Sequence, residues 1–290
     1  MITMNAHCFQ CLVTRTLDRA RPLGDDDTVT AFSRELLKLY ANMPDTVSSS
    51  YACPDTAALM LKYFGLDPDY LREEKAESNR FVLERLDSIR SRVEATADPV
   101  YSALQFSILG NYLDFAALHG KVSFDDLDKM LDEALDMPLD KEVYAQFRSD
   151  LQNGKTLLYI TDNAGEIGFD RIMAEQIAKA FPHLQITFCV RGGPVHNDAT
   201  REDAAVMGIQ FPIVDNGTTV AGTPIDLMSE ESKSALETAD VILAKGMGNI
   251  ETMFGCGYNV YYAFLIKCAR LVQFFDKPMM TPMFVRDAKQ

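Results

Sequence analysis

The sequence predicts an α/β protein with a helical N-terminal region and a second domain built on a mostly parallel sheet. Through the first half, apolar residues recur at helical spacing, and no convincing strand precedes residue 155. From residue 156 onward, short apolar runs alternate with helical segments, which is typical of a parallel sheet with helices on both faces. We place the boundary at the turn Asn153–Gly154. The expected domains are therefore 1–153, a helical lid or cap, and 154–290.

The composition is that of an ordinary globular protein. The chain has 290 residues, of which 47% are hydrophobic and 24% are charged. Its 42 acidic and 28 basic residues give a formal charge of −14, which argues against a nucleic-acid-binding surface because phosphate contacts require a basic face. No apolar run approaches the roughly 20 residues of a membrane span, and the N-terminus lacks the pattern of a signal peptide. We expect a cytoplasmic protein without membrane or nucleic-acid partners, and the oligomeric state stays open.

Capping and breaking residues divide the first half into successive helices. Asp25–Asp27 offer N-caps for the second helix, which should stop before Pro44, and Pro54 suits the first turn of the third. Asp98 and Pro99 then restart the chain into a strongly apolar helix. The expected helices cover 8–19, 25 to about 42, 54–63, 69–95, 100–118, 124–135 and 141–152.

The second half should contain buried strands separated by helices. The strands are short apolar runs bounded by polar residues or glycine, at 156–161, 185–191, 210–214 and 241–244, with further strands at 260–266 and 282–285. The helices between them are expected at 166–181, 200–207 and 229–238. A glycine loop is expected after the strand at 241–244.

Acidic and amide side chains follow the first two predicted strands. Asp162 and Asn163 come directly after the first strand, and Asp198 lies in the glycine- and proline-containing loop after the second. Ligands bind beyond the carboxyl ends of parallel strands, so these loops should share one edge. Two carboxylates and an amide oxygen there would suit Mg²⁺ or Mn²⁺. The alternative is that these residues only cap the following helices.

The loop after the strand at 241–244 offers a cation beside glycine amides. Lys245 and Gly246 could hold a phosphate group through one charge and several N–H donors. The dinucleotide fingerprint GxGxxG fails because Glu251 replaces its third glycine, and no GxxxxGK[ST] loop occurs. Arg191, at the end of the second strand, is another candidate phosphate contact. Either cation could instead be an ordinary surface residue.

Two features of the helical half could also carry function. Asn111 and Asp114 lie three positions apart in the predicted apolar helix and so share a face, where they could line a pocket or form a solvent-facing stripe. Cys8 and Cys11 form a single CxxC, which is weak evidence for zinc because a structural site needs four ligands. Buried inert thiols and a metal or redox role both remain open.

Three loop motifs, taken in order, resemble the metal-dependent damage-control phosphatase family. They are DNAGE after the first strand, GGPVHNDAT after the second and KGMGNIE after the fourth. The CxxC, the segment GNYLD and the pair Lys267-Cys268 are similar to the prokaryotic branch that carries CxxC. The resemblance covers nearly the whole chain. It implies a three-layer α/β/α domain with a Rossmann-like sheet and one divalent cation at the sheet edge.

The resemblance also implies roles for individual residues. The metal ligands would be Asp162, Asn163 and Asp198, and the substrates would be small phosphorylated metabolites, including sugar phosphates and phosphopantetheine-like compounds. Lys245 and Gly246 would be similar to the family's phosphate contacts, and Glu166 and Asn111 would line the pocket. Apart from the resemblance, we also expect Asp114, Arg191 and Asn249 to bind substrate.

The reaction implied is the hydrolysis of a phosphate monoester. A divalent cation (Mg, Mn, Co or Ni) would polarise a phosphoryl oxygen and activate water, with Asp162, Lys245 and Glu166 as the catalytic set. Direct attack by water is favoured because the DxDxT pattern of aspartyl-phosphate enzymes is absent. Two other functions stay open. An S-adenosylmethionine-dependent carboxyl methyltransferase is disfavoured by the absence of a GxGxG-like turn after the first strand. The other is a non-catalytic metal- or metabolite-binding protein.

Overall fold

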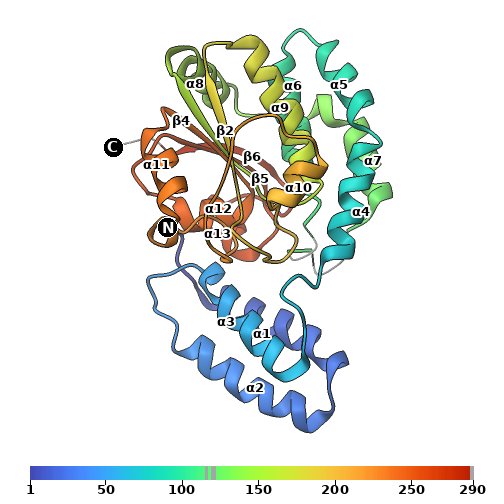
Figure 1. Ribbon diagram of the computed structural model, residues 1–290, viewed down its shortest axis with the longest axis vertical. Coiled ribbons are helices and arrows are strands. Elements are labelled where there is room, and N and C mark those ends of the chain that lie inside the picture. The colour runs from blue at the N-terminus through green and yellow to red at the C-terminus, as the bar shows by residue number, and fades with distance from the viewer. Residues whose placement is uncertain (115–116, 119–121, 288–290) are drawn as a thin grey trace.

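The computed structural model describes residues 1–114, 117–118 and 122–287 (Figure 1). Its first three helices, α1 (Ala6–Ala20), α2 (Asp26–Ala41) and α3 (Cys53–Phe64), form a lobe below the rest of the molecule in Figure 1. Their inward faces share a small hydrophobic cluster that includes Phe32 and Leu36. The N-cap at Asp25 is confirmed, since its side chain accepts from Thr28 N. Short 3₁₀ turns lie at Arg21–Leu23 and Ser49–Ala52.

The remaining N-terminal helices lie against the sheet. They are α4 (Arg72–Leu83), α5 (Leu86–Glu94), α6 (Pro99–Gly110), α7 (Phe124–Asp132) and α8 (Lys141–Asn153), with a 3₁₀ turn at Ala134–Asp136. Their apolar side chains join one hydrophobic cluster with one face of the sheet, across the boundary placed at residue 153. That boundary stays a prediction about domain organisation.

The sheet has six strands, and all but the last run parallel. They are β1 (Thr156–Ile160), β2 (Gln185–Val190), β3 (Ile213–Asp215), β4 (Val241–Lys245), β5 (Val260–Leu265) and β6 (Pro282–Asp287). Their order across the sheet is β3-β2-β1-β4-β5-β6, with β6 antiparallel to β5. The predicted mostly parallel sheet is confirmed.

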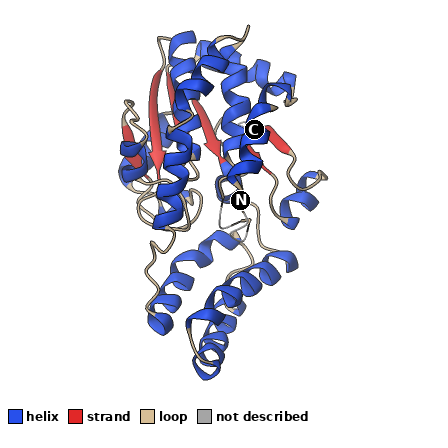
Figure 2. Cartoon of the chain, turned by 90° about the vertical axis from the view of Figure 1, so that its right-hand side faces the viewer, coloured by secondary structure: helices blue, strands red, loops and turns tan. Residues whose placement is uncertain are grey.

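Helices cover both faces of this sheet (Figure 2). The helices that complete the fold are α9 (Glu166–Ala180), α10 (Arg201–Val206), α11 (Glu230–Thr238), α12 (Gly246–Met253) and α13 (Ala269–Phe275), with a 3₁₀ turn at Ile225–Leu227. Successive strand residues alternate between two hydrophobic clusters: Leu157 and Tyr159 pack with α6 and α9, whereas Leu158 and Ile160 pack with α11, α12 and α13. The three-layer α/β/α arrangement is therefore confirmed.

Two predicted helices of the first half are wrong in extent. The segment 69–95 is two helices, because the chain turns at Glu84 and Arg85 between α4 and α5. The Arg85 guanidinium donates to both carboxylate oxygens of Asp128, at 2.7 and 2.8 Å. The helix expected over 100–118 ends at Gly110, where the backbone tightens into i→i+3 turns such as Tyr112 N to Leu109 O. Residues 115–116 of that prediction lie outside the described residues.

The glycine loop predicted after β4 is wrong. Gly246 begins α12, and Met247, Ile250 and Met253 pack under the sheet at helical spacing. Gly246 has φ +78°, a left-handed conformation that lets the chain turn directly from strand to helix. The third strand is also shorter than predicted, and α13 was not foreseen. Among the described residues, no helix combines the length and apolar character needed to cross a membrane.

Candidate active site

The candidate site lies where the chain reverses its direction of travel across the sheet. From β1 the chain continues to β2 and β3 on one side, and it then returns to β4 on the other side of β1. The loops that leave β1 and β4 therefore diverge, which creates a crevice at the carboxyl ends of these strands. Asp162 follows β1, and Lys245 is the last residue of β4.

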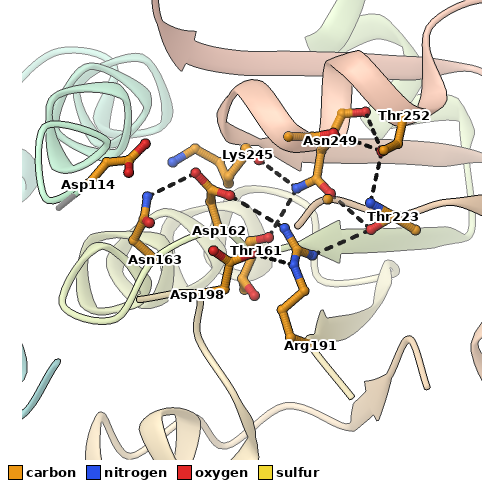
Figure 3. Close-up of polar contacts among 12 residues, drawn as sticks. Asp114, Thr161, Asp162, Asn163, Arg191, Asp198, Thr223, Lys245, Asn249 and Thr252 are labelled. Carbon is orange, nitrogen blue, oxygen red and sulfur yellow. Dashed lines mark hydrogen bonds and ion pairs between the residues drawn. The ribbon is translucent and has the colours of Figure 1, made fainter. Parts of the chain in front are cut away.

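Backbone hydrogen bonds hold the first two loops together. Asn163 and Asp198 form an isolated antiparallel bridge, Ala164 N donates to Asn197 O at 2.8 Å, and Ala199 N donates to Asp162 O at 2.6 Å. The carboxylates of Asp162 and Asp198 are thereby brought to the same place, as the sequence predicted for these two loops (Figure 3).

Arg191 lies between these two carboxylates. Its Nε donates to Asp198 Oδ2 at 2.6 Å, its Nη2 lies 3.4 Å from Asp162 Oδ1, and its Nη1 lies 3.5 Å from Thr223 Oγ1. The side chain is fully buried. Burial raises the pKa of Asp198 to about 6 although Arg191 opposes the shift, and burial together with Asp198 and Glu166 raises the pKa of Asp162 well above its usual range. One guanidinium therefore compensates the two carboxylates only in part.

Two amides connect Asp162 to Glu166. The Asn163 Nδ2 group donates at 2.8 Å to both Asp162 Oδ2 and Glu166 Oε2, and Asn111 Nδ2 lies 3.0 Å from the same two oxygens. The Asn111 Oδ1 atom accepts from Leu265 N, so both ends of this buried side chain are used. The Asn163 hydrogen bonds use only its nitrogen, and no described residue donates to its Oδ1 atom. That oxygen is thus available to a ligand.

Lys245 is buried under the site and fully hydrogen-bonded. Its ammonium donates to Glu166 Oε1 at 2.7 Å, Asp170 Oδ1 at 3.0 Å and Ser107 O at 2.9 Å. Burial opposes the charge, but Asp170 and Glu166 outweigh it and raise the pKa of Lys245. Burial also raises the pKa of Asp170, to about 6. All three ammonium hydrogens are used within the protein.

The turn after β4 fits closely against Asp162. A Cβ atom on Gly246 would lie 1.9 Å from Asp162 Oδ2, so only glycine allows this approach. One turn later, Asn249 donates from Nδ2 to Thr161 O at 3.0 Å and accepts from Thr223 at 2.9 Å. Both residues therefore shape the site, and Figure 3 shows the Asn249–Thr223–Arg191 chain of contacts.

A cavity of about 920 Å³ opens in front of Asp162, Asn163 and Asp198. Its opposite wall comes from α1 and α3, so the helical lobe faces the strand ends across it. Lys267, which follows β5, also lines the cavity and pairs with Asp114 Oδ2 at 2.7 Å. Burial alone would raise the pKa of Asp114, but Lys267 and the Ala117 amide outweigh it and lower that pKa.

Most sequence-predicted residues come together here, but not all of them reach the cavity. Asp162, Asn163, Asp198 and Asp114 line it. The other candidates are buried behind these residues and contact them directly or through one neighbour: Arg191, Lys245, Glu166, Asn111, Gly246 and Asn249. Sequence reasoning assigned no role to Lys267. Its position at a strand end is the signal that could have identified it, since Lys245 was chosen on that ground.

The donor set of this site fits a divalent cation. Five buried carboxylates face three buried cations, which leaves two negative charges in excess: Asp114, Asp162, Glu166, Asp170 and Asp198 against Arg191, Lys245 and Lys267. Among the described residues, no group of three or more His, Cys, Asp or Glu is placed to hold a metal ion. The candidate set instead joins two carboxylates to one amide oxygen, so water or substrate oxygens would have to complete the shell.

Within the described ranges, Cys8 and Cys11 belong to no group of three or more His, Cys, Asp or Glu residues that could hold a metal ion. Cys8 and Cys11 lie on α1, and together with Cys53 and Cys268 they line the cavity. Burial raises the pKa of Cys53 to about 11 and that of Cys268 to about 12, so both are neutral thiols at pH 7. The choice between inert thiols and a metal or redox role for Cys8 and Cys11 stays open.

The chain is similar to known damage-control phosphatases. Residues 4–281 match the family model described as the damage-control phosphatase ARMT1-like domain. A damage-control phosphatase of Archaeoglobus fulgidus is 32% identical over 251 residues, which are 85% of each chain. A damage-control phosphatase of Pyrococcus horikoshii is 29% identical over 223 residues, 76% of this chain and 75% of the relative. The crystal structure of a DUF89 family protein from Pyrococcus horikoshii superposes with a TM-score of 0.83 at 24% identity, covering 99% of this chain and 100% of that one.

Proposed function

Because the chain belongs to the family of damage-control phosphatases with an ARMT1-like domain, we propose that it is a divalent-metal-dependent phosphatase of small phosphorylated metabolites. The observation that carries the proposal is that Asp162, Asn163 and Asp198 line one cavity together. The excess of two carboxylates over cations around the site would favour a bound cation. Substrates of the proposed class include sugar phosphates and phosphopantetheine-like compounds. Neither a methyltransferase nor a non-catalytic binding protein is favoured by the comparisons, in which two relatives are named as damage-control phosphatases.

The three residues on the cavity wall would hold the cation. Asp162 and Asp198 would supply carboxylate oxygens and Asn163 its free amide oxygen, a hard set suited to Mg²⁺, Mn²⁺, Co²⁺ or Ni²⁺. When bound, such an ion polarises a phosphoryl oxygen and lowers the pKa of water. Asn111 and Glu166 would position Asp162 and Asn163 from behind.

The cations divide into two roles under this proposal. Lys267 lines the cavity, and its ammonium group has two internal acceptors, Asp114 Oδ2 and Asn111 O, so one hydrogen is left that would bind a phosphoryl oxygen. Lys245 and Arg191 were suggested by the sequence as direct phosphate contacts. Both side chains donate their hydrogen bonds to internal carboxylates, so we assign them a positioning role. Lys245 would keep Glu166 ionised and in place, and Arg191 would do the same for Asp198.

Removal of divalent metal tests the proposed function. Exhaustive chelation should abolish phosphate release from a panel of sugar phosphates and phosphopantetheine, and separate addition of the four candidate ions should restore it. With a substrate chiral at phosphorus, configuration should invert, because a single displacement by water inverts the centre whereas a phosphoenzyme pathway retains it. Full turnover by protein shown by elemental analysis to lack divalent metal would contradict the proposal.

Gly246→Ala should disable the site without removing a functional group. The new methyl group would meet Asp162 Oδ2 at 1.9 Å, so Asp162 must move, and we expect kcat/KM to fall by about 100-fold. Left-handed strain adds a destabilisation of about 1–2 kcal/mol. Gly257→Ala is the matched control, since Gly257 has φ +80° and nothing within 4 Å of its Cβ position. Equal kcat/KM losses in the two variants would show that Asp162 is not the cause.

A further inference from the structure

Two arginines on the cavity wall opposite the carboxylates have no role in the proposed reaction. Arg15 and Arg19 lie four residues apart on α1, so they project from the same side of this helix, and both line the cavity. Both side chains are half-buried. In Figure 1, α1 belongs to the lower lobe, whereas the sheet belongs to the body above it.

Neither guanidinium has an anionic partner in the part of the chain that the structure describes. Arg191 and Arg201 form ion pairs, but no described carboxylate lies within 4.0 Å of Arg15 or Arg19. Arg19 instead lies over the ring of Tyr70, 4.4 Å from its centroid. Burial lowers the pKa of Arg19, whereas burial is outweighed at Arg15 by the charges of Cys11 and Asp114, which raise the pKa of Arg15. Partial burial of two arginines without a carboxylate partner lowers the stability of the folded protein. The chain has 42 acidic residues that could have supplied such partners.

The groups beside these arginines do not neutralise them. The imidazole of His196 lies between Cys53 Sγ at 3.5 Å and the Tyr70 hydroxyl at 3.4 Å. Burial raises the pKa of the Cys53 thiol to about 11, so this group carries no charge that would pair with the arginines at pH 7. This wall of the cavity therefore presents the positive charges of Arg15 and Arg19; Glu251 also lines the cavity, but its carboxyl group forms no ion pair with either guanidinium.

We propose that Arg15 and Arg19 form an anion subsite that binds a second acidic group of the substrate, remote from the phosphoryl group that reacts. The substrate class would then be a small phosphate ester that also carries a carboxylate or a second phosphate. A volume of about 920 Å³ leaves room for such a molecule to span the cavity. Guanidinium groups suit this task because they bind both kinds of oxyanion through paired N–H donors. The inference rests on the proposed phosphatase function.

Matched substrate pairs test the subsite. One pair is glucose 6-phosphate and 6-phosphogluconate, which differ by a carboxylate, and the other is fructose 6-phosphate and fructose 1,6-bisphosphate, which differ by a phosphate. The wild type should show a kcat/KM at least about tenfold higher for the doubly anionic member of at least one pair. Arg15→Gln and Arg19→Gln should each lower that ratio by about tenfold, mainly through KM, and Arg15→Lys should restore part of it.

The control is Arg34→Gln, which removes an exposed positive charge from α2 outside the cavity. The selectivity ratio should not change in this variant. The proposal of a subsite would be overturned if the wild type had equal kcat/KM for the two members of both pairs. It would also be overturned if Arg15→Gln lowered kcat/KM by the same factor for both members of a pair. Failure of the phosphatase proposal itself is a separate result, namely no phosphate release by the wild type from any of the four compounds with any of the four metals.

Discussion

Asp162→Asn should lower kcat/KM for phosphate release by about 10³-fold, which corresponds to about 4 kcal/mol of transition-state stabilisation. The substitution keeps the size of the side chain but removes the charge that would hold a divalent cation. It also exchanges one acceptor for a donor that points at Arg191 or Asn111. Steady-state kinetics with saturating Mn²⁺ and a generic aryl phosphate measure the change, and calorimetric titration should show weakened metal binding.

Asp27→Asn is the control for this loss. Asp27 lies exposed in the first turn of α2, outside the cavity, and its substitution removes the same charge as Asp162→Asn. Its kcat/KM should equal that of the wild type. If Asp162→Asn kept more than a tenth of wild-type activity while folding normally, Asp162 could not be a ligand on which the reaction depends.

The second large effect is on stability. Lys245→Met should lower the free energy of unfolding by about 3–5 kcal/mol at pH 7, because it leaves Glu166 and Asp170 buried without their counter-ion. Thermal or urea unfolding measures the change. Activity should fall too, since Glu166 accepts the hydrogen bonds that position Asn163 and Asn111.

A second substitution distinguishes charge from shape as the cause. Adding Asp170→Asn to Lys245→Met removes one of the uncompensated carboxylates and should recover part of the lost stability. Lys277→Met, at an exposed position after α13, is the neutral control. A Lys245→Met variant within about 0.5 kcal/mol of the wild type would show that the buried ion pairs do not support the site.

Much of the site could be predicted because its residues follow strand ends. The carboxyl ends of parallel strands meet at one edge, so Asp162 and Asp198 were expected to lie together from strand positions alone. Lys245 was placed at the right strand end by the same reasoning, but its burial was not foreseen. That burial depends on Ser107, Glu166 and Asp170, which come from two helices whose packing on the strand is a tertiary property.

The errors have local causes. The glycines of the KGMGN segment predict a loop, because glycine usually interrupts helices. Gly246 instead forms the turn between β4 and α12. The apolar spacing of Met247, Ile250 and Met253 indicates the helix that follows. The predicted helix over 100–118 is too long because the apolar character of the segment continues beyond Gly110, where the helix ends. The next residue, Asn111, donates its amide hydrogens to Asp162 and Glu166. Lys267 and Arg15 were missed as site residues because nothing in their sequence neighbourhood shows which wall of a cavity they face.

The central claim is that Asp162, Asn163 and Asp198 hold one divalent cation at the edge of the sheet. Crystals grown with Mn²⁺ and measured at the manganese absorption edge test it most directly. We expect one strong anomalous peak with oxygen atoms of these three residues about 2.1–2.3 Å away. A manganese peak bound by other residues, or none at a concentration that supports full phosphatase activity, would contradict it.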